Sequence, residues 1–339
     1  MIHILKRNFT IGTRVNKMPT FDNSFLFNHT CLRIKDPKVS IPFYEKNFGF
    51  KHLRTFPVSK EGYTLYELGI EGEGKKGVNW AAREGILELR HKPGSENDDS
   101  FEINNGNSKE FRGFGHICLS VDNIQASESH LLDDGVKFQK KLSDGRQKNI
   151  AFALDPDGYW IELIEHGKDR VEGKTELSSY KLNHTMIRVK DPVKSLDFYR
   201  NVLGFKLFSK KEFESAEFTL YFLGFDHSKD LKEGELAWDT QAGRESILEL
   251  THNWGTESDN SFEGYHNGND TANGAKQGFG HICVSCKDPL TFCQQIEKEY
   301  GDKVKWSVKY NQGPVPDNAF IQDPDGYLIE IFGSNMLSE

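Results

Sequence analysis

The chain contains two copies of one sequence pattern, and this duplication limits the folds it can adopt more than any other feature. Four phrases recur in the same order in both halves. In the first half they are NHTCLRIKDP, REGILELRH, RGFGHICLSV and DPDGYWIE; in the second half they are NHTMIRVKDP, RESILELTH, QGFGHICVSC and DPDGYLIE. The spacing between matching phrases grows slowly along the chain, as it would through small loop insertions. Such self-similarity indicates a tandem duplication, so both halves should adopt the same fold.

The duplication also predicts how the 339 residues divide. At roughly 150 residues for a typical domain, the length suits about two domains. We expect an N-terminal tail over residues 1–24, a first repeat over 25–169, a linker over 170–179 and a second repeat over 180–339.

Each repeat shows a strand, a helix and then several strands, and shows this order twice. In the first repeat HTCLRIK alternates like a strand, and the amphipathic segment after KDP reads as a helix that ends at Gly49. The next strand-like runs are TLYELGI, VNWAA and GILELRH. The second module begins with the strand GHICLSV and the helix IQASESHLLDDGV, and it closes with two strands joined by a DPDG turn. The sequence therefore predicts an α+β fold of four βαβββ modules with curved mixed sheets.

Polar side chains occupy one face of these strands. Because side chains alternate along a strand, Glu162 points away from its apolar neighbours Ile161 and Leu163. Each phrase carries such a His or Glu: His29, Glu88, His116 and Glu162 in the first copy, and His184, Glu249, His281 and Glu330 in the second. If the sheets curl, these groups converge, and buried carboxylates are costly unless a positive charge lies between them. We therefore expect metal ligands here, although a single His or Glu on a strand is more often a surface residue.

The four phrases, in this order, resemble those of lactoylglutathione lyase, or glyoxalase I, a family of the vicinal oxygen chelate superfamily. The resemblance covers residues 25–167 and 180–333, and it is to the fused two-repeat form of the family. It implies that each metal site draws its ligands from both repeats. One site would use His29, Glu88, His281 and Glu330, and its mate would use His184, Glu249, His116 and Glu162.

The resemblance also implies a cofactor and a reaction. The long loop with NGN is similar to that of the zinc-dependent branch, so Zn²⁺ is expected in both sites, while mixed His and carboxylate ligands leave Ni²⁺ or Co²⁺ open. The implied reaction turns the hemithioacetal of glutathione and methylglyoxal into S-lactoylglutathione, through an enediolate that the metal stabilises as a Lewis acid. Glu162 and Glu330 are the expected principal bases, with Glu249 and Glu88 as their partners in proton transfer.

Five residues match the family's glutathione-binding positions: Arg33, Arg188, Asn253, Arg112 and Lys140. In the other repeat Lys92 replaces Asn253, Gln277 replaces Arg112, and Val308 replaces Lys140, with Lys309 next to it. The site of His184 thus keeps four matching side chains, whereas the site of His29 keeps Arg33. Because a hydrogen bond to a charged group is worth about 1.5–3 kcal/mol, the two sites should differ in glutathione affinity or in preferred aldehyde.

Composition and charge limit the binding partners and the cell compartment that we expect for the protein. The formal net charge of −8 argues against a nucleic-acid partner, and no apolar run approaches the ~20 residues of a membrane-spanning helix. Five cysteines form no framework spacing, and the CxxC of Cys283 and Cys286 has no second pair, so reduced thiols and a cytoplasmic location are expected. The basic, acid-free start of the chain also fits a mitochondrial presequence. Fusion of the repeats predicts a monomer that forms its pseudo-dimer internally.

Two alternatives to the lyase stay open at this point. Another metalloenzyme of the same superfamily, such as an extradiol dioxygenase or a thiol transferase, would use related ligands. A dioxygenase usually needs a three-ligand iron site with open positions, whereas four ligands are expected here. The second alternative is a protein that binds a small molecule without turnover, and a metal-free protein that still bound its ligand would favour it.

Overall fold

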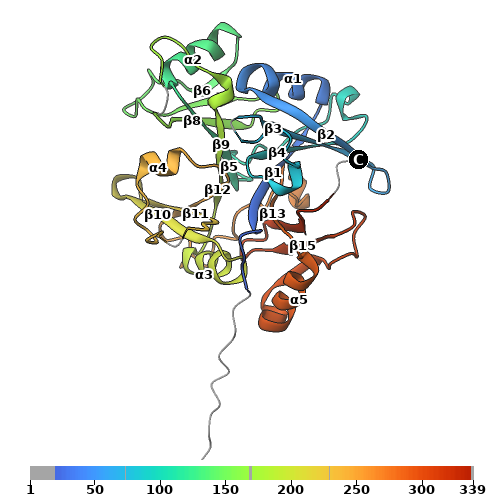
Figure 1. The fold of residues 1–339 in the computed structure, drawn as a ribbon. Helices are drawn as coiled ribbons and strands as arrows, with labels where there is room; N and C mark the ends of the chain where they lie inside the picture. The colour runs from blue at the N-terminus through green and yellow to red at the C-terminus, as the bar shows by residue number, and fades with distance from the viewer. Residues whose placement is uncertain (1–19, 73, 168–169, 229, 337–339) are drawn as a thin grey trace, which may run out of the picture.

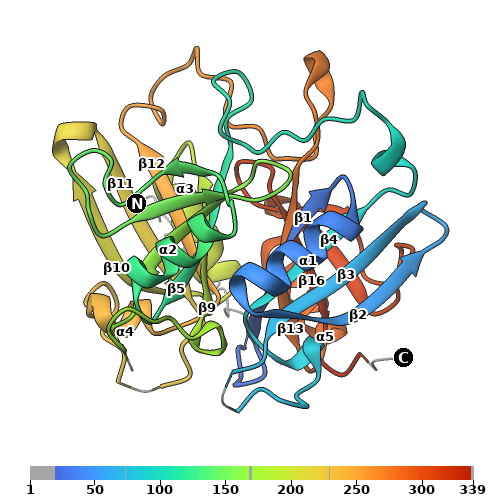
Figure 2. The same cartoon turned by 90° about the horizontal axis from the view of Figure 1, so that it is seen from above.

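The computed structural model describes residues 20–72, 74–167, 170–228 and 230–336. The basic residues of the expected N-terminal tail therefore lie outside the described residues. The described chain forms two mixed sheets of eight strands each, which lie side by side in Figure 2. All five cysteines, including those of the CxxC, are buried and form no disulfide.

The first sheet combines strands from both ends of the chain, in the order β14-β15-β16-β13-β1-β4-β3-β2. The first repeat supplies β1 (Leu26–Ile34), β2 (Phe50–Val58), β3 (Tyr63–Ile70) and β4 (Ile86–His91). The second repeat supplies β13 (Phe279–Cys286), β14 (Lys305–Val308), β15 (Asn318–Gln322) and β16 (Leu328–Gly333). The two groups join where β1 and β13 run antiparallel, with Cys31 opposite His281.

The second sheet has the same plan with the repeats exchanged, in the order β10-β11-β12-β9-β5-β8-β7-β6. The first repeat supplies β5 (Phe114–Val121), β6 (Phe138–Lys140), β7 (Ala151–Leu154) and β8 (Trp160–Glu165). The second repeat supplies β9 (Lys181–Arg188), β10 (Lys206–Phe213), β11 (Phe218–Gly224) and β12 (Ile247–Asn253). Each sheet thus holds one module of each repeat, and the predicted α+β fold of four βαβββ modules is confirmed. The boundaries of the repeats and the linker stay predictions.

The α-helices of the described chain are α1 (Pro37–Phe48), α2 (Ile124–Asp133), α3 (Pro192–Asp197), α4 (Trp238–Ala242) and α5 (Pro289–Tyr300), and Figure 1 shows them around the sheets. Helix α1 begins where the KDP phrase predicts, because the Asp36 side chain accepts a hydrogen bond from the Lys38 amide and Pro37 suits the first position. It ends at Gly49 as predicted, with a φ of 72°. None of the described helices is long and apolar enough to cross a membrane.

One predicted strand is wrong. Part of VNWAA forms a 3₁₀ turn, Trp80–Ala82, instead of a strand. The Asn79 side chain caps this turn by accepting a hydrogen bond from the Ala81 amide, and Asn28 Nδ2 donates to the carbonyl oxygens of Trp80 and Arg83. These side-chain contacts offer the backbone an alternative to sheet pairing. The remaining strand of the module is β2, which follows Gly49 directly.

The DPDG phrases form the predicted hairpin turns, and they also tie modules together. Strands β7 and β8 pair antiparallel around the first turn, and β15 and β16 around the second. The Tyr44 hydroxyl donates to Asp155 over 2.9 Å, and the Tyr199 hydroxyl donates to Asp323 over 2.8 Å. Each tyrosine follows the first strand of its own repeat. The two modules of one repeat therefore stay linked although they belong to different sheets.

The GFG phrases allow a close approach between the two sheets. Phe114 and Phe279 stack across the boundary with ring centroids 5.1 Å apart. The glycine before each phenylalanine pairs with a loop of the other repeat, Gly113 with His266 and Gly278 with Asn104. A Cβ atom on either glycine would lie 1.8 Å from the carbonyl oxygen of its partner. Only glycine fits at these two positions.

Candidate active sites

Two groups of four buried side chains meet, one group in each sheet. Site A consists of His29 on β1, Glu88 on β4, His281 on β13 and Glu330 on β16. Site B consists of His184 on β9, Glu249 on β12, His116 on β5 and Glu162 on β8. The structure therefore brings together the two groups that the sequence predicts, each with side chains from both repeats.

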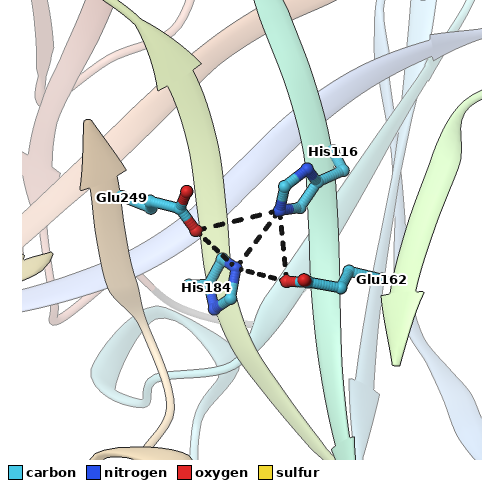
Figure 3. A group of neighbouring side chains, drawn as sticks. All are labelled: His116, Glu162, His184 and Glu249. Atoms are coloured by element: carbon cyan, nitrogen blue, oxygen red, sulfur yellow. Dashed lines mark hydrogen bonds and ion pairs between the residues drawn. The ribbon is translucent and has the colours of Figure 1, made fainter. Parts of the chain in front are cut away.

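Site B is compact. His184 Nε2 lies 3.0 Å from Glu162 Oε2 and 3.0 Å from Glu249 Oε2. His116 Nε2 lies 3.3 Å from both His184 Nε2 and Glu162 Oε2. Figure 3 shows the two carboxylates reaching the histidines from opposite sides. One ligand atom from each of the four residues lies within 4.8 Å of all the others.

Site A has the same arrangement with one looser member. His29 Nε2 lies 3.0 Å from His281 Nε2 and 3.2 Å from Glu330 Oε2, and His281 Nε2 is also 3.2 Å from Glu330 Oε2. Glu88 is further away, at 3.8 Å from His29 and 3.5 Å from His281. The four side chains of site A are thus arranged as in site B, but Glu88 lies further from the histidines than the other carboxylate does.

The donor atoms of both sites fit a divalent cation. Ligand atoms held at ~2.0–2.2 Å from one ion lie roughly 3–3.5 Å from each other. Every contact described above has this spacing except that of Glu88 with His29, at 3.8 Å. The first histidine of each site also presents a fixed nitrogen. His29 Nδ1 lies 2.7 Å from Asn28 Oδ1, and His184 Nδ1 lies 2.8 Å from Asn183 Oδ1. Since that oxygen accepts, Nδ1 carries a proton, which leaves Nε2 as the nitrogen that can bind a metal.

Asn28 and Asn183 are site residues that the strand pattern does not identify, although the repeated NHT phrase carries the signal. Their amide groups are anchored in turn, because Asn183 Nδ2 donates to the carbonyl oxygens of Gln241 and Arg244 as Asn28 Nδ2 does to those of Trp80 and Arg83. The amide orientation follows from this network. Each asparagine therefore fixes one histidine ring.

The electrostatics of both sites favour ionised carboxylates beside a positive group. Burial raises the pKa of Glu162, but the charge of His116 and the hydrogen bonds of both histidines outweigh it and lower that pKa overall. In site A the hydrogen bonds of His281 and His29 likewise outweigh burial and lower the pKa of Glu330. Burial lowers the pKa of His29, but the charge of Glu88 and the contact with Glu330 raise it overall. Positive charge is thus stabilised at the centre of each group.

A cavity of about 350 Å³ opens from site B and brings three of the predicted glutathione-binding residues together, Arg188, Arg112 and Asn253. Arg188 is held in place by the GFG backbone: its Nη1 donates to the Phe114 carbonyl oxygen over 3.1 Å and its Nη2 to Asn107 Oδ1 over 3.0 Å. Lys140 turns instead to its own loop, where its Nζ donates to the carbonyl oxygens of Gln147 and Ile150.

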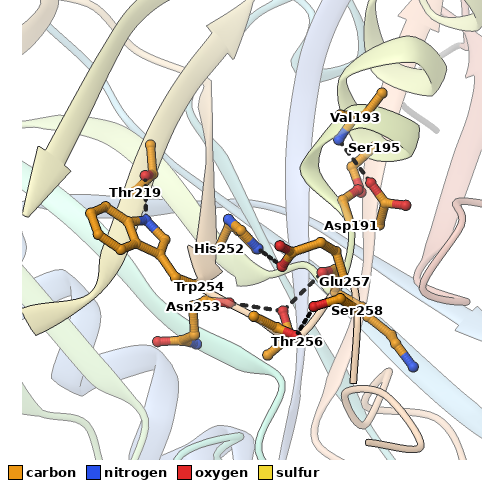
Figure 4. A network of polar contacts seen from close by, with 12 residues as sticks. Asp191, Val193, Ser195, Thr219, His252, Asn253, Trp254, Thr256, Glu257 and Ser258 are labelled. Atoms are coloured by element: carbon orange, nitrogen blue, oxygen red, sulfur yellow. Dashed lines mark hydrogen bonds and ion pairs between the residues drawn. The ribbon is translucent and has the colours of Figure 1, made fainter. Parts of the chain in front are cut away.

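Asn253 sits at the end of β12, in a turn that Figure 4 shows in detail. Thr256 Oγ1 donates to the Asn253 carbonyl oxygen over 2.9 Å, and His252 Nε2 lies 2.8 Å from Glu257 Oε2. Asn253 Nδ2 donates to the Tyr265 hydroxyl over 2.7 Å. In the first repeat His91 and Glu96 form the same contact at 2.9 Å beside Lys92. Both repeats therefore form the same turn. They differ in the side chain that follows the histidine, which is Asn253 in one repeat and Lys92 in the other.

Site A has one further cation, Arg90, that the sequence pattern does not single out. Its Arg33 is held like Arg188, with Nη1 donating to the Phe279 carbonyl oxygen over 3.0 Å. Arg90 pairs with Arg33 on the neighbouring strand and lies over the Tyr63 ring at 3.7 Å, at a register position where site B has Thr251. Arg33, Arg90 and Lys92 line one cavity with Gln277. Site A therefore has Gln277 where site B has Arg112, and Arg90 where site B has Thr251.

Glu67 on β3 is a further buried acid beside site A. Its side chain is fully buried, and its cross-strand partner is Glu88. Burial, and then the charge of Glu88, raise the pKa of Glu67 well above its usual range. Site B has no matching acid, because Phe222 pairs with Glu249 at this register position.

Comparison with known proteins agrees with this geometry. The chain matches the model of the Glyoxalase/Bleomycin resistance protein/Dioxygenase superfamily over residues 26–163 and 181–331. It is similar to glyoxalase I of Saccharomyces cerevisiae, with 48% identity over 322 residues that cover 94% of this chain and 95% of the yeast protein. The chain belongs to the glyoxalase I family. A lactoylglutathione lyase of Schizosaccharomyces pombe is 41% identical, with 91% and 96% covered.

Other members of the glyoxalase I family place the repeats in context. A lactoylglutathione lyase of Pseudomonas aeruginosa matches 47% of this chain over 86% of its own length, at 44% identity, so it corresponds to a single repeat. The crystal structure of glyoxalase I from Zea mays shares the fold, with a TM-score of 0.63, 23% identity, and 92% and 93% of the two chains covered. The predicted two-repeat family and its enzyme class, lactoylglutathione lyase, are thus confirmed.

Proposed function

We propose that site A and site B each convert the hemithioacetal of glutathione and methylglyoxal into S-lactoylglutathione, and so detoxify 2-oxoaldehydes. The observation that carries this proposal is the convergence of two histidine nitrogens and two carboxylates in each sheet of a glyoxalase I family chain. The matching contacts lie between 3.0 and 3.9 Å. Both sites are built within one chain, so we propose that a monomer suffices for activity.

The residues of sites A and B would each hold one metal ion, and we propose Zn²⁺, to which His nitrogen and carboxylate oxygen ligands are suited. When bound, the ion supplies Lewis-acid stabilisation of the negative charge that develops on the substrate oxygens. The mixed ligand set suits Ni²⁺ and Co²⁺ as well. Turnover measured after each metal is added to the metal-free protein tells these three ions apart.

Within each site the carboxylates move the proton. We propose that Glu162 in site B and Glu330 in site A remove the proton from the carbon that bears sulfur, and that the proton returns to the neighbouring carbon. Glu249 and Glu88 stand across the histidines and serve as partners in this transfer. No atom is lost or gained, so the step is an isomerisation. In site B the apolar side chains of Phe152 and Phe222 line the cavity and limit the access of water.

Glutathione would lie along the cationic side of each cavity. In site B, Arg188, Arg112 and Asn253 offer donors to its carboxylates. In site A, Arg90 lines both the cavity at the ligands and a second cavity, in which Arg33 and Lys92 would add donors. A direct contact from Lys140 stays a prediction, because Lys140 donates to the loop carbonyls of Gln147 and Ile150. The alternatives, another metalloenzyme reaction or binding without turnover, are outcomes of the experiment below.

Removal of the metal is expected to abolish turnover of the preformed hemithioacetal, and Zn²⁺ should restore it. The apo protein should also unfold at a lower temperature, because four acceptor groups would lose their common cation in each site. The measurement is formation of the thioester product together with thermal unfolding, before and after chelation. Full turnover by protein shown to be free of metal, or none after addition of zinc, nickel or cobalt to folded protein, would contradict the proposal.

Asn183→Leu is expected to weaken zinc binding at site B by about 10–100-fold, since His184 loses the acceptor that fixes its ring. Asn183→Asp keeps an acceptor beside His184 Nδ1 and serves as the matched control. The measurement is the number of zinc ions retained against a competing chelator. We expect one ion to be lost from the leucine variant and two to remain in the aspartate variant. Retention of both ions by the leucine variant would show that the ring needs no such partner.

A further inference from the structure

Sites A and B differ in one row of side chains that runs across their sheets. In site A, Arg54, Glu67 and Glu88 stand opposite one another on β2, β3 and β4. In site B the same row reads Ser209, Phe222 and Glu249. The last residue of each row, Glu88 or Glu249, is one of the proposed metal ligands. The residue next to it is acidic in site A and aromatic in site B.

The alternation of side chains on β3 turns Glu67 into the substrate cavity. Tyr63, Leu65 and Glu67 line the site A cavity of about 250 Å³. The matching residues of β11, which are Phe218, Leu220 and Phe222, line the site B cavity. Glu67 therefore occupies the place at which Phe222 gives site B an apolar wall beside its proposed metal ligands.

The opposite wall of the site A cavity is polar as well. Asn318 on β15 precedes Phe320, which pairs with Glu330, just as Ile150 precedes Phe152, which pairs with Glu162. Both Asn318 and Ile150 line their cavities. Asn318 Nδ2 donates to Glu330 Oε1 over 2.9 Å, and its Oδ1 has no hydrogen-bond partner among the described residues. Two walls of site A are thus polar at positions where site B is apolar.

Several of these polar atoms have no hydrogen-bond partner among the described residues: both oxygens of Glu67, Asn318 Oδ1, Trp80 Nε1 and Arg54 Nε. All four residues line the site A cavity. In the described part of the chain, no residue lining the site B cavity carries such an atom. Buried polar groups are normally paired, so this wall suits a substrate group with polar atoms better than an apolar one.

The unpaired atoms include both acceptors and donors. Asn318 Oδ1 accepts, the carboxyl group of Glu67 accepts and, when protonated, also donates, and Trp80 Nε1 and Arg54 Nε donate. Arg54 also stands next to Glu67 in the row, so a guanidinium group and a carboxyl group lie side by side in that wall. A neutral group that both donates and accepts suits this combination better than an ion does. Hydroxyl groups have that property, whereas a methyl or phenyl group would leave every one of these atoms unpaired.

We propose that site A takes hemithioacetals whose aldehyde-derived group carries hydroxyls, and that Glu67 is the residue that sets this preference. The inference rests on the proposed function, because it assigns a substrate class to one of the two lyase sites. Site B, with Phe222, Ile150 and Phe152 around the same space, takes apolar groups such as methyl or phenyl. A site built to hydrogen-bond a substrate discriminates strongly against an analogue that lacks the hydrogen-bonding group.

The test compares the two sites one at a time. Glu162→Gln leaves site A intact, and Glu330→Gln leaves site B intact. Each variant is given the glutathione adducts of methylglyoxal, phenylglyoxal and 3-hydroxy-2-oxopropanal. We expect the ratio of kcat/KM for the hydroxylated adduct to that for the methylglyoxal adduct to be at least about tenfold higher at site A. A ratio measured on one preparation does not depend on its fraction of active protein.

Glu67→Phe, added to the variant that retains site A, should lower this ratio to that of site B, while Glu67→Gln keeps hydrogen-bonding atoms and should hold it within about threefold. Phe222→Glu in the variant that retains site B should raise the ratio, and it gives an independent answer if Glu67→Phe does not fold. Zinc content is measured for each protein. We expect it to be unchanged by the exchange at residue 67.

Several results would overturn the inference and leave the lyase function standing. These are equal ratios at the two sites, a ratio insensitive to both exchanges, loss of zinc from Glu67→Phe, which would make Glu67 a metal ligand, or turnover confined to site B for all three adducts. Failure of the unmodified, zinc-loaded chain to turn over any of the adducts would instead contradict the proposed function itself.

Discussion

Replacing both Glu162 and Glu330 by glutamine is expected to reduce turnover of the glutathione–methylglyoxal hemithioacetal to about 1% or less, since general-base catalysis contributes roughly 10²–10⁴-fold. Glutamine has the shape of glutamate, but its amide does not take up a proton at neutral pH. Glu162 and Glu330 lie in separate sheets, so each single variant should lose one site and keep the other. Steady-state kinetics of the three variants, with zinc content measured in parallel, gives the answer.

The single variants also report how far the two sites differ. Arg188, Arg112 and Asn253 surround site B, whereas Arg33, Arg90 and Lys92 stand near site A, so KM for the same adduct should differ between Glu162→Gln and Glu330→Gln. Identical kinetic constants would remove the predicted difference. Activity near that of the unmodified chain in the double variant would exclude both glutamates as bases.

Features that depend on neighbouring residues in the chain could be predicted from the sequence. The end of α1 at Gly49, the DPDG hairpins and the faces of the eight His and Glu side chains all follow from turn chemistry and strand alternation. The assignment of those side chains to two groups came from the family resemblance, because strand alternation does not say which modules share a sheet. The pairing of β1 with β13 and of β5 with β9 decides this.

Other features depend on tertiary neighbours, and the sequence pattern did not reveal them. Glu67 in TLYELGI reads as one polar residue of a strand, and it becomes a cavity residue because its face of β3 lies between Arg54 and Glu88. In the VNWAA segment only Val78 and Trp80 favour a strand, and the capping side chains of Asn79 and Asn28 hold part of it in a 3₁₀ turn. In both cases a contact with another element decides the outcome.

Gly113→Ala and Gly278→Ala are each expected to lower the free energy of unfolding by about 3 kcal/mol, because overpacking against a fixed backbone forces the chain to move. The added Cβ would lie 1.8 Å from the carbonyl oxygen of His266 or Asn104. Gly333→Ala is the matched control: its Cβ would have Pro289 as nearest neighbour at 3.6 Å. We expect that variant to unfold within about 1 kcal/mol of the unmodified chain in denaturant titrations.

The same substitutions should act on one site each, because the displaced backbone holds a glutathione-binding arginine. Arg188 Nη1 donates to the Gly113 carbonyl oxygen over 3.2 Å, and Arg33 Nη1 donates to that of Gly278 over 3.3 Å. Gly113→Ala should therefore raise KM at site B when only that site is intact, and Gly278→Ala should do so at site A. Stability equal to that of Gly333→Ala, or an equal rise in KM at both sites, would show that the close approach of the GFG loops does not position these arginines.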